Sequence, residues 1–275
     1  MEDVTMAINE LSISTCVFGA ERGPGEMLGD YMELALNAGF KMVEISHAVP
    51  EKESSMNAFR NSGIKVWSIH GVMGMGAISP DKAERDKAVE LAYRHAAGYA
   101  EFAPCPLVEH YLDRHSDRKV ADYYRYSIEK LFEKVSALGY ILCIETAPYK
   151  PKEYDRHPNS MEIAEFIRSF NSPQLQMTVD INHSNLYENL LATADITHGL
   201  VKNIHVSNNY GICENHLPPD IGVIDIKQAF DALRLHGYAG PCNLEFSFPG
   251  QKGITPTLTQ LMEVRRYMEK LLWNR

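Results

Sequence analysis

The sequence predicts a single-domain α/β protein, a (β/α)8 barrel that takes up residues 1–275. The chain has 275 residues, of which 45% are apolar and 23% charged, an ordinary globular composition. Short apolar runs alternate with longer helical stretches, and no Pro/Gly/Ser-rich linker or charge block divides the chain. Parallel strands need a crossover helix, and eight such units fill about 250 residues.

Eight runs rich in β-branched and apolar residues are predicted as strands: 13–18, 41–45, 65–69, 107–110, 140–145, 176–181, 201–206 and 242–246. An open, doubly wound sheet is the rival architecture. No GxGxxG motif opens a helix, and the run GVMGMG at 71–76 has neither that spacing nor a Walker lysine. The alternation therefore favours the closed barrel.

Helices are predicted over 26–36, 81–102, 118–138, 160–170, 185–197, 226–236 and 257–272. Ser160 and Thr257 have the residue type of N-caps, and glycines stand where four helices should end, at Gly39, Gly63, Gly139 and Gly237. The Gly-rich or Pro-rich segments 71–80 and 208–222 follow strand-like runs and are expected as loops within the one domain.

Composition also bounds the environment of the protein. Lys and Arg number 27 against 36 Asp and Glu, a balance of −9 that disfavours nucleic acid as a partner. No apolar run reaches the roughly 18 residues of a membrane span, and the acidic start MEDVTMAINE predicts no signal peptide. Five scattered cysteines indicate reduced thiols, so we expect a cytoplasmic protein without a membrane partner.

Strand parity indicates a site at one end of the barrel. Alternate residues of a barrel strand face the interior and the helices. In the fifth strand Leu142 and Ile144 share the apolar face, so Cys143 and Glu145 point inward. The same parity places one polar residue late on the inner face of each of five strands: His70, Glu145, Asp180, His205 and Glu245. Active sites of barrels form at this end of the strands.

Such a set predicts a divalent metal ion. Three inward carboxylates and two imidazoles would repel and desolvate one another without a cation. The mixed oxygen and nitrogen donors fit Mn, Mg, Co or Zn and do not select among them. The chain offers no thiolate cluster for a closed structural zinc site.

Several motifs resemble those of the xylose isomerase-like TIM barrels, the sugar-phosphate isomerase/epimerase group that shares its fold with endonuclease IV. The motifs are IETAP (144–148), VDINHSN (179–185), NIHVSNN (203–209), ENHLPPDIGVIDI (214–226), GYAG (237–240) and NLEFSF (243–248). The resemblance runs from about residue 10 to 250 in order and spacing. Asp220 and Ile221 depart from the Gly-containing pair that is common in the family's LPP loop.

The resemblance implies roles for particular residues. It implies a metal set of Glu145, Asp180, His205 and Glu245, and catalytic roles for Glu145, Glu245 and His183. It also implies substrate binding by His70, His110, His183, Glu214 and His216. The implied activity is that of a metal-dependent sugar or sugar-phosphate isomerase or epimerase. Such an enzyme removes a proton next to a carbonyl, passes through an enediolate and takes a small carbohydrate as substrate. A homodimer or homotetramer is expected from the same resemblance.

Three other functions fit the same residues. An endonuclease IV-like phosphodiesterase would use all nine residues named above for metal binding, catalysis and substrate binding as a multi-zinc site for abasic DNA. The acidic balance of the chain and the Gly/Met loop after His70 argue against this function. A dehydratase of a cyclic polyol or ketone needs the same metal and base. A binding module with a relict site would leave an intact ligand set unused.

A few further residues have weaker expectations. Glu44 has inward parity and would line the pocket, whereas Glu109 would face the helices, a poor place for an unpaired charge. Trp67 has outward parity and is expected to pack, and Phe18, Tyr149 and Phe248 would either wall a sugar site or pack. No chemistry is assigned to His47, His95, His115, His157, His198 and His236.

Overall fold

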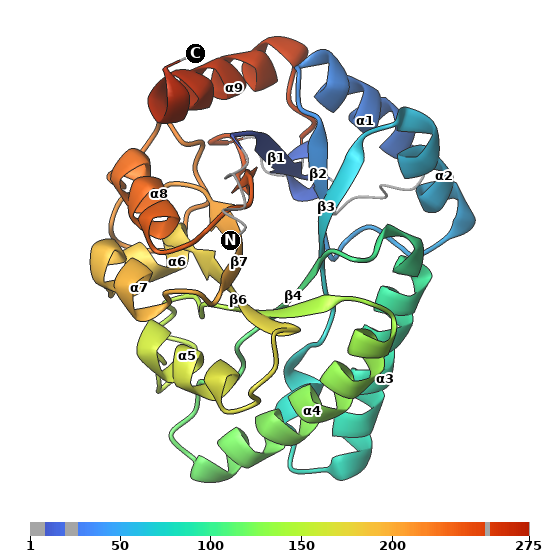
Figure 1. Ribbon diagram of the computed structural model, residues 1–275, viewed down its shortest axis with the longest axis vertical. Helices are drawn as coiled ribbons and strands as arrows, with labels where there is room; N and C mark the ends of the chain where they lie inside the picture. Colours follow the sequence, from blue (N-terminus) through green and yellow to red (C-terminus); the bar gives the residue numbers. More distant parts are fainter. Residues whose placement is uncertain (1–8, 20–26, 251–253, 275) are drawn as a thin grey trace, which may run out of the picture.

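A computed structural model describes residues 9–19, 27–250 and 254–274 and confirms the predicted barrel (Figure 1). Eight parallel strands close in chain order, with β8 pairing back onto β1. The strands are β1 (Leu11–Ser14), β2 (Met42–Ile45), β3 (Lys65–His70), β4 (Pro106–His110), β5 (Ile141–Glu145), β6 (Leu175–Asp180), β7 (Val201–Val206) and β8 (Cys242–Leu244).

Helices surround the strands and cover their outer side (Figure 1). In the described residues they are α1 (Leu28–Asn37), α2 (Glu53–Ser62), α3 (Lys82–Gly98), α4 (Arg118–Ala137), α5 (Ser160–Arg168), α6 (Ile181–Asn185), α7 (Leu190–Ile196), α8 (Ile226–Leu235) and α9 (Leu258–Trp273). Helix α8 buries Ile226, Ala229, Phe230 and Leu233, the spacing of a single apolar stripe. Helix α2 was not predicted, because Met56 and Phe59 are its only buried apolar side chains.

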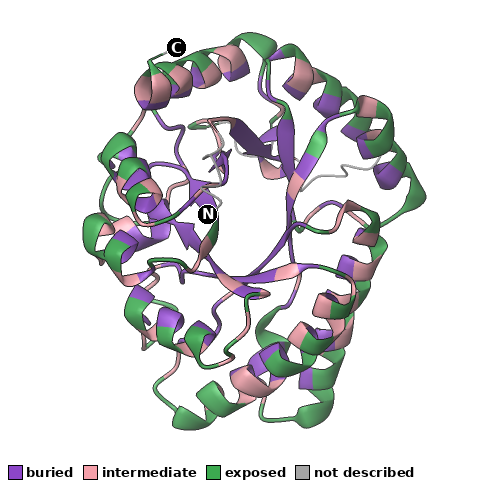
Figure 2. Ribbon diagram, in the orientation of Figure 1, coloured by how far each residue is buried: buried purple, intermediate pink, exposed green. Residues whose placement is uncertain are grey.

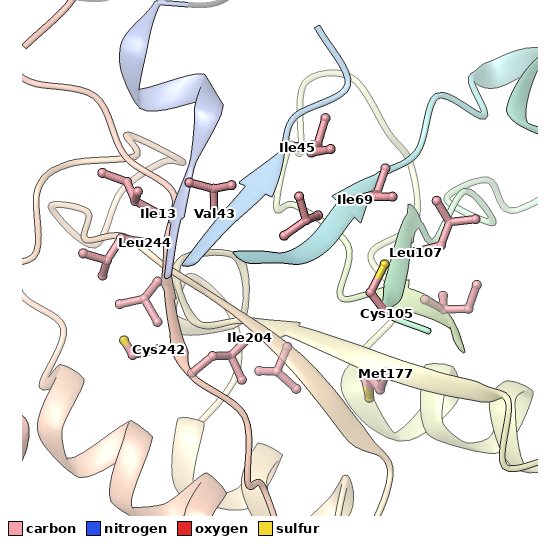
Figure 3. Packing of buried hydrophobic residues seen from close by; sticks show 14 of the residues in the cluster. Ile13, Val43, Ile45, Ile69, Cys105, Leu107, Met177, Ile204, Cys242 and Leu244 are labelled. Atoms are coloured by element: carbon pink, nitrogen blue, oxygen red, sulfur yellow. The ribbon is translucent and has the colours of Figure 1, made fainter. Parts of the chain in front are cut away.

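The main apolar core lies between the strands and the helices, not inside the barrel. Figure 2 shows buried strands ringed by helices that expose their outer faces, and Figure 3 shows part of the apolar layer around the strands. Ile13, Val43 and Leu244 belong to this layer and are fully buried. Their strand neighbours, such as Ser12 and Asn243, are equally buried but polar. The barrel interior is therefore polar, which prepares it to hold charged groups.

Several predicted boundaries were wrong. The first strand ends at Ser14, and residues Thr15–Phe18 form a 3-10 turn. The predicted 185–197 helix is divided between α6 and α7, and position 26 lies outside the described residues. Asn159, not Ser160, caps α5, because its side chain accepts from the Glu162 backbone N–H in a capping box. Thr257 caps α9 as predicted.

The outward parity predicted for Trp67 was also wrong. The pairing of β2 with β3 shifts by one residue, since Val43 pairs with Val66 while Glu44 pairs with Ser68. This bulge leaves Trp67 as the extra residue and turns its side chain. Its indole Nε1 donates to Asn203 Oδ1 at 2.8 Å. Because β3 and β7 lie on opposite sides of the barrel, this bond crosses the interior.

Candidate metal centre and active site

Four of the predicted site residues converge at the C-terminal end of the strands. Glu145 and Asp180 end β5 and β6, His205 lies near the end of β7, and Glu245 directly follows β8. The backbone N–H of Glu245 still donates to Val206 O, which keeps this residue in register with β7. Each of the four side chains has one potential metal-ligating atom, and these four atoms all lie within 4.8 Å of one another. The strand ends therefore bring the four together; their role as metal ligands stays a prediction.

His205 is held at the centre of this group by three carboxylates. Its Nδ1 lies 2.9 Å from Glu145 Oε1 and 3.0 Å from Glu245 Oε2. On the other side of the ring, Nε2 lies 2.9 Å from Glu44 Oε2. Burial lowers the pKa of His205, but Glu44, Glu245 and Glu145 outweigh burial and raise it well above its usual value. The protein therefore offers a site that stabilises a buried positive charge.

Glu44 is fully buried, and one of its oxygens is saturated with donors. Besides His205, Glu44 Oε2 accepts from Ser68 Oγ at 2.7 Å and from Asn243 Nδ2 at 2.9 Å. Donation from Nε2 to Glu44 leaves Nδ1 of a neutral His205 with its lone pair toward the other carboxylates. Sequence parity predicted that Glu44 would line the pocket, but Glu44 is not among the lining residues of the cavity; its contact with His205 depends on the closure of the barrel.

Two carboxylate oxygens at the centre are not fully satisfied. Glu145 Oε2 and Asp180 Oδ2 are buried and accept no hydrogen bond of good geometry; imidazole nitrogens approach them, His110 Nε2 at 3.2 Å and His183 Nε2 at 3.4 Å. Asp180 is oriented by its other oxygen, which accepts from the backbone N–H groups of Asn182 and His183 at 2.7 and 3.2 Å. Buried carboxylate oxygens without donors are costly unless a cation compensates them. The carboxylates of Glu145, Asp180 and Glu245 and the imidazole of His205 thus form a set that fits a divalent metal ion.

The ionisation of the carboxylates follows from the same contacts. Burial raises the pKa of Glu145, yet His110, His205 and His70 outweigh it and hold that pKa well below the usual range. Burial likewise opposes the ionisation of Glu245, and His205 again lowers its pKa. Asp180 differs, because burial and the neighbouring Glu145 raise its pKa despite His183. The two glutamates are therefore ionised at neutral pH.

His183, Glu214 and His216 form a second group beside the first. His216 Nε2 lies 2.7 Å from Glu214 Oε1, and His183 Nε2 lies 3.6 Å from the same oxygen and 3.4 Å from Asp180 Oδ2. His183 Nδ1 donates to Thr146 O at 2.9 Å, which directs Nε2, a buried atom without a hydrogen-bond partner, toward the centre. Burial lowers the pKa of His183, but Asp180, Glu214 and Glu145 raise it to about 10.

His70 and His110 approach Glu145 from the third and fourth strands. Their Nε2 atoms lie 3.5 and 3.2 Å from Glu145 Oε2. Burial lowers the pKa of both rings. In His70 the effect of Glu145 prevails and raises the pKa to about 9. In His110 burial, assisted by His70 and Arg114, prevails over Glu145 and lowers the pKa to about 3.

Glu109 faces away from the barrel interior, as predicted, and it is paired. Its carboxylate accepts from the backbone N–H of Met73 at 3.0 Å, and a Cβ at Gly71 would overlap this carboxylate. Burial raises the pKa of Glu109 to about 7, despite opposing effects of His70 and the backbone N–H groups. Glu109 thus anchors the loop that follows His70.

Part of this site borders a cavity of about 590 Å³, a size typical of small-molecule sites: His70, His110, Glu145, His183, Glu214, His216 and Glu245. The cavity is also lined by His47, to which the sequence assigned no chemistry and whose ring centroid lies 5.3 Å from that of His70. Phe248 and Phe246 border the cavity. Phe18 and Tyr149 pack instead, against Tyr31 and Tyr187.

Sequence reasoning did not single out three further lining residues: Arg114, Lys150 and Tyr154. They lie in the loops that follow β4 and β5, where no periodicity tells which side chains turn inward. Only the folded loops place them at the cavity.

Fold and site together define a parallel (β/α)8 barrel with an acidic, histidine-rich centre at the C-terminal end of its strands. The chain belongs to the Xylose isomerase-like TIM barrel family, whose model matches residues 32–271. No helix in the described ranges combines the length and hydropathy needed to cross a membrane.

Comparison with solved structures agrees with this fold. An L-ribulose 3-epimerase is 19% identical at a TM-score of 0.77, and the alignment covers 96% of this chain and 95% of that one. The D-allulose 3-epimerase from Methylomonas sp. in complex with D-allulose is 15% identical at a TM-score of 0.78, with 98% and 100% covered. A D-tagatose 3-epimerase-like protein is 16% identical at 0.76, with 95% and 96% covered. At these identities the likeness establishes the fold; no curated protein sequence matches the chain.

Proposed function

We propose that this protein is a metal-dependent ketose epimerase or isomerase that works by proton abstraction next to a carbonyl. The observation that carries the proposal is the placement of Glu145 and Glu245. Their carboxylates approach His205 Nδ1 at 2.9 and 3.0 Å, and both side chains line the cavity. Two carboxyl groups that meet at one centre suit a reaction in which one, ionised, removes a proton and the other, once protonated, delivers one.

Glu145, Asp180, His205 and Glu245 would hold the divalent cation. The incompletely satisfied oxygens of Glu145 and Asp180 are the observation that supports this assignment. When bound, such a cation polarises a substrate carbonyl and stabilises the negative charge that develops on its oxygen.

The remaining steps use the chain's own side chains. Glu245 or Glu145, as a carboxylate, accepts the proton from the carbon next to the carbonyl. For epimerisation the other glutamate must first take up a proton from solvent, which it then delivers to the same carbon. His183, with its Nδ1 fixed on Thr146 O, directs Nε2 into the site. With Nδ1 donating to Thr146 O, Nε2 would contact the substrate oxygen on which charge develops.

The similar structures support a carbohydrate substrate. Two of them are described as ketose 3-epimerases, and one of these holds D-allulose. His70, His110, Glu214 and His216 border the same cavity and would contact the hydroxyl groups of the sugar. Assembly as a homodimer or homotetramer is part of the same proposal.

The test is exchange of the substrate proton. Chelator-treated protein is reloaded with Mn²⁺, Mg²⁺, Co²⁺ or Zn²⁺ and incubated in D₂O with ketoses, hydroxypyruvate and inososes. We expect metal-dependent deuterium incorporation next to the carbonyl, and loss of that exchange in Glu245→Gln. Exchange that proceeds equally without metal, or in Glu245→Gln, would contradict the proposal. Loss of water from an inosose without epimerisation would identify a dehydratase instead.

The two flanking groups favour one second candidate, a multi-metal phosphodiesterase acting at abasic sites. His70, His110 and Glu145 form one ligand-like group, and His183, Glu214 and His216 form another. The balance of −9 argues against duplex DNA as a partner, because affinity for DNA rests largely on phosphate neutralisation. Metal-dependent nicking of an abasic duplex at physiological salt, lost in His110→Ala and His216→Ala, would establish this candidate in place of the epimerase.

A further inference from the structure

Arg114 is a buried cation that borders the cavity and has no carboxylate partner. The residue is 5% exposed and lies in the loop between β4 and α4. Its Nε donates to Tyr111 O at 2.8 Å, and the guanidinium carbon lies 5.0 Å from the centre of the Tyr154 ring. Throughout the described ranges, Arg114 forms no ion pair. Its terminal nitrogens are thus held in place with no acceptor supplied by the protein.

The nearest acidic side chain in the sequence is engaged elsewhere. Asp113 pairs with Arg156 at 3.0 Å, and Arg156 also contacts Glu162 at 3.2 Å. A second cation, Lys150, lines the same cavity from the loop after β5, and its Nζ lies 3.5 Å from Glu214 Oε2. Arg114 thus adds a positive charge without a carboxylate partner to the side of the cavity formed by the β4 and β5 loops, beside Lys150, which is paired with Glu214.

Arg85 provides a comparison within the same chain. It is also buried, at 8% exposure, donates to a backbone carbonyl of Ser79, and lies over Tyr123 with its guanidinium carbon 4.6 Å from the ring centre. Arg85 does not line the cavity. Of these two buried arginines only Arg114 lines the cavity, and a guanidinium fork matches the oxygens of a phosphate or carboxylate.

We propose that Arg114, assisted by Lys150, binds a terminal phosphate group of the substrate, so that the protein acts on a phosphorylated ketose. This inference rests on the proposed epimerase or isomerase function. A phosphate monoester carries about −1.5 to −2 charges near neutral pH. The two cations, Arg114 and Lys150, therefore complement a phosphate better than they complement a singly charged carboxylate. The contact with the Tyr154 ring and the Nε hydrogen bond to Tyr111 O orient the guanidinium before the substrate arrives.

The first experiment compares matched substrates on the metal-loaded enzyme: D-ribulose 5-phosphate with D-ribulose, and D-fructose 6-phosphate with D-fructose. We expect the phosphorylated ketose to have the higher kcat/KM. Arg114→Gln should lower kcat/KM for the phosphorylated ketose about 10- to 100-fold more than for the neutral one, the cost of losing a charge-assisted hydrogen-bond pair. Arg85→Gln, the matched control, should leave the preference unchanged. A preference for the neutral ketoses, or an equal effect of Arg114→Gln on both substrates, would overturn the proposal.

The second experiment separates the phosphate site from the reaction. Ribitol 5-phosphate and ribitol have no carbonyl and cannot react, so their binding to the metal-loaded protein is measured by calorimetry. We expect ribitol 5-phosphate to bind more tightly than ribitol, and Arg114→Gln but not Arg85→Gln to remove that difference. If this holds while no ketose is turned over, the phosphate site stands and the proposed reaction fails. If Arg114→Gln leaves the binding of ribitol 5-phosphate unchanged, the phosphate site is refuted whatever the activity.

Discussion

Replacing Glu44 with Gln should weaken metal binding without unfolding the barrel. Glu44 Oε2 accepts from His205 Nε2, Ser68 Oγ and Asn243 Nδ2 at 2.7 to 2.9 Å, while its Oε1 is buried with no donor. Gln has the same shape and can keep these acceptor bonds, but its NH₂ group then has no acceptor and the negative charge behind His205 is lost. Residues that orient a metal ligand in this way typically contribute about 10- to 100-fold to metal affinity.

The assay is calorimetric titration of chelator-treated protein with Mn²⁺, together with the thermal midpoint of the metal-free protein. Glu44→Gln should raise the dissociation constant about 10- to 100-fold. Ser68→Ala serves as the control, because it removes one donor to Glu44 and leaves the contact with His205 in place; its effect on affinity should be much smaller. Unchanged affinity in Glu44→Gln, or an equal loss in Ser68→Ala, would refute the role assigned to Glu44.

Three further predictions test the strand register, the loop after His70 and the pH dependence. Glu245→Gln should abolish turnover at an unchanged thermal midpoint, whereas Leu244→Ala, which empties a fully buried core position, should cost about 2–5 kcal/mol in urea unfolding; the reverse pattern would contradict the register. Gly71→Ala should lower both stability and activity, because its Cβ would overlap the Glu109 carboxylate. A crystal structure of the Gly71→Ala variant in which His70 keeps its position would show this reasoning to be wrong. Folding raises the pKa of Glu109 from 4.5 to about 7, so its contribution to stability should fall as pH rises from 4.5 to 7; Glu109→Gln should remove that slope from the free energy of unfolding, and parallel pH profiles would count against it.

The sequence determined the barrel and the four residues at its centre. Alternation of strands with helices implies parallel pairing, and the two-residue period of a strand places Glu145, Asp180 and His205 on one face. Because parallel strands all end at the same side of a barrel, late inward residues must meet there. That inference needs only local periodicity, which is why it withstood errors of several residues in the strand boundaries.

Tertiary structure alone decided what surrounds this centre. The contact between Glu44 and His205 crosses the barrel from β2 to β7, and the bulge that turns Trp67 inward depends on how β2 pairs with β3. Arg114 reaches the cavity through the β4 loop. Loops and bulges have no period from which a side chain's direction follows, because their backbone angles are set by packing and hydrogen bonds between segments far apart in the chain. The centre could thus be predicted from sequence, whereas the residues that tune it and select its substrate could not.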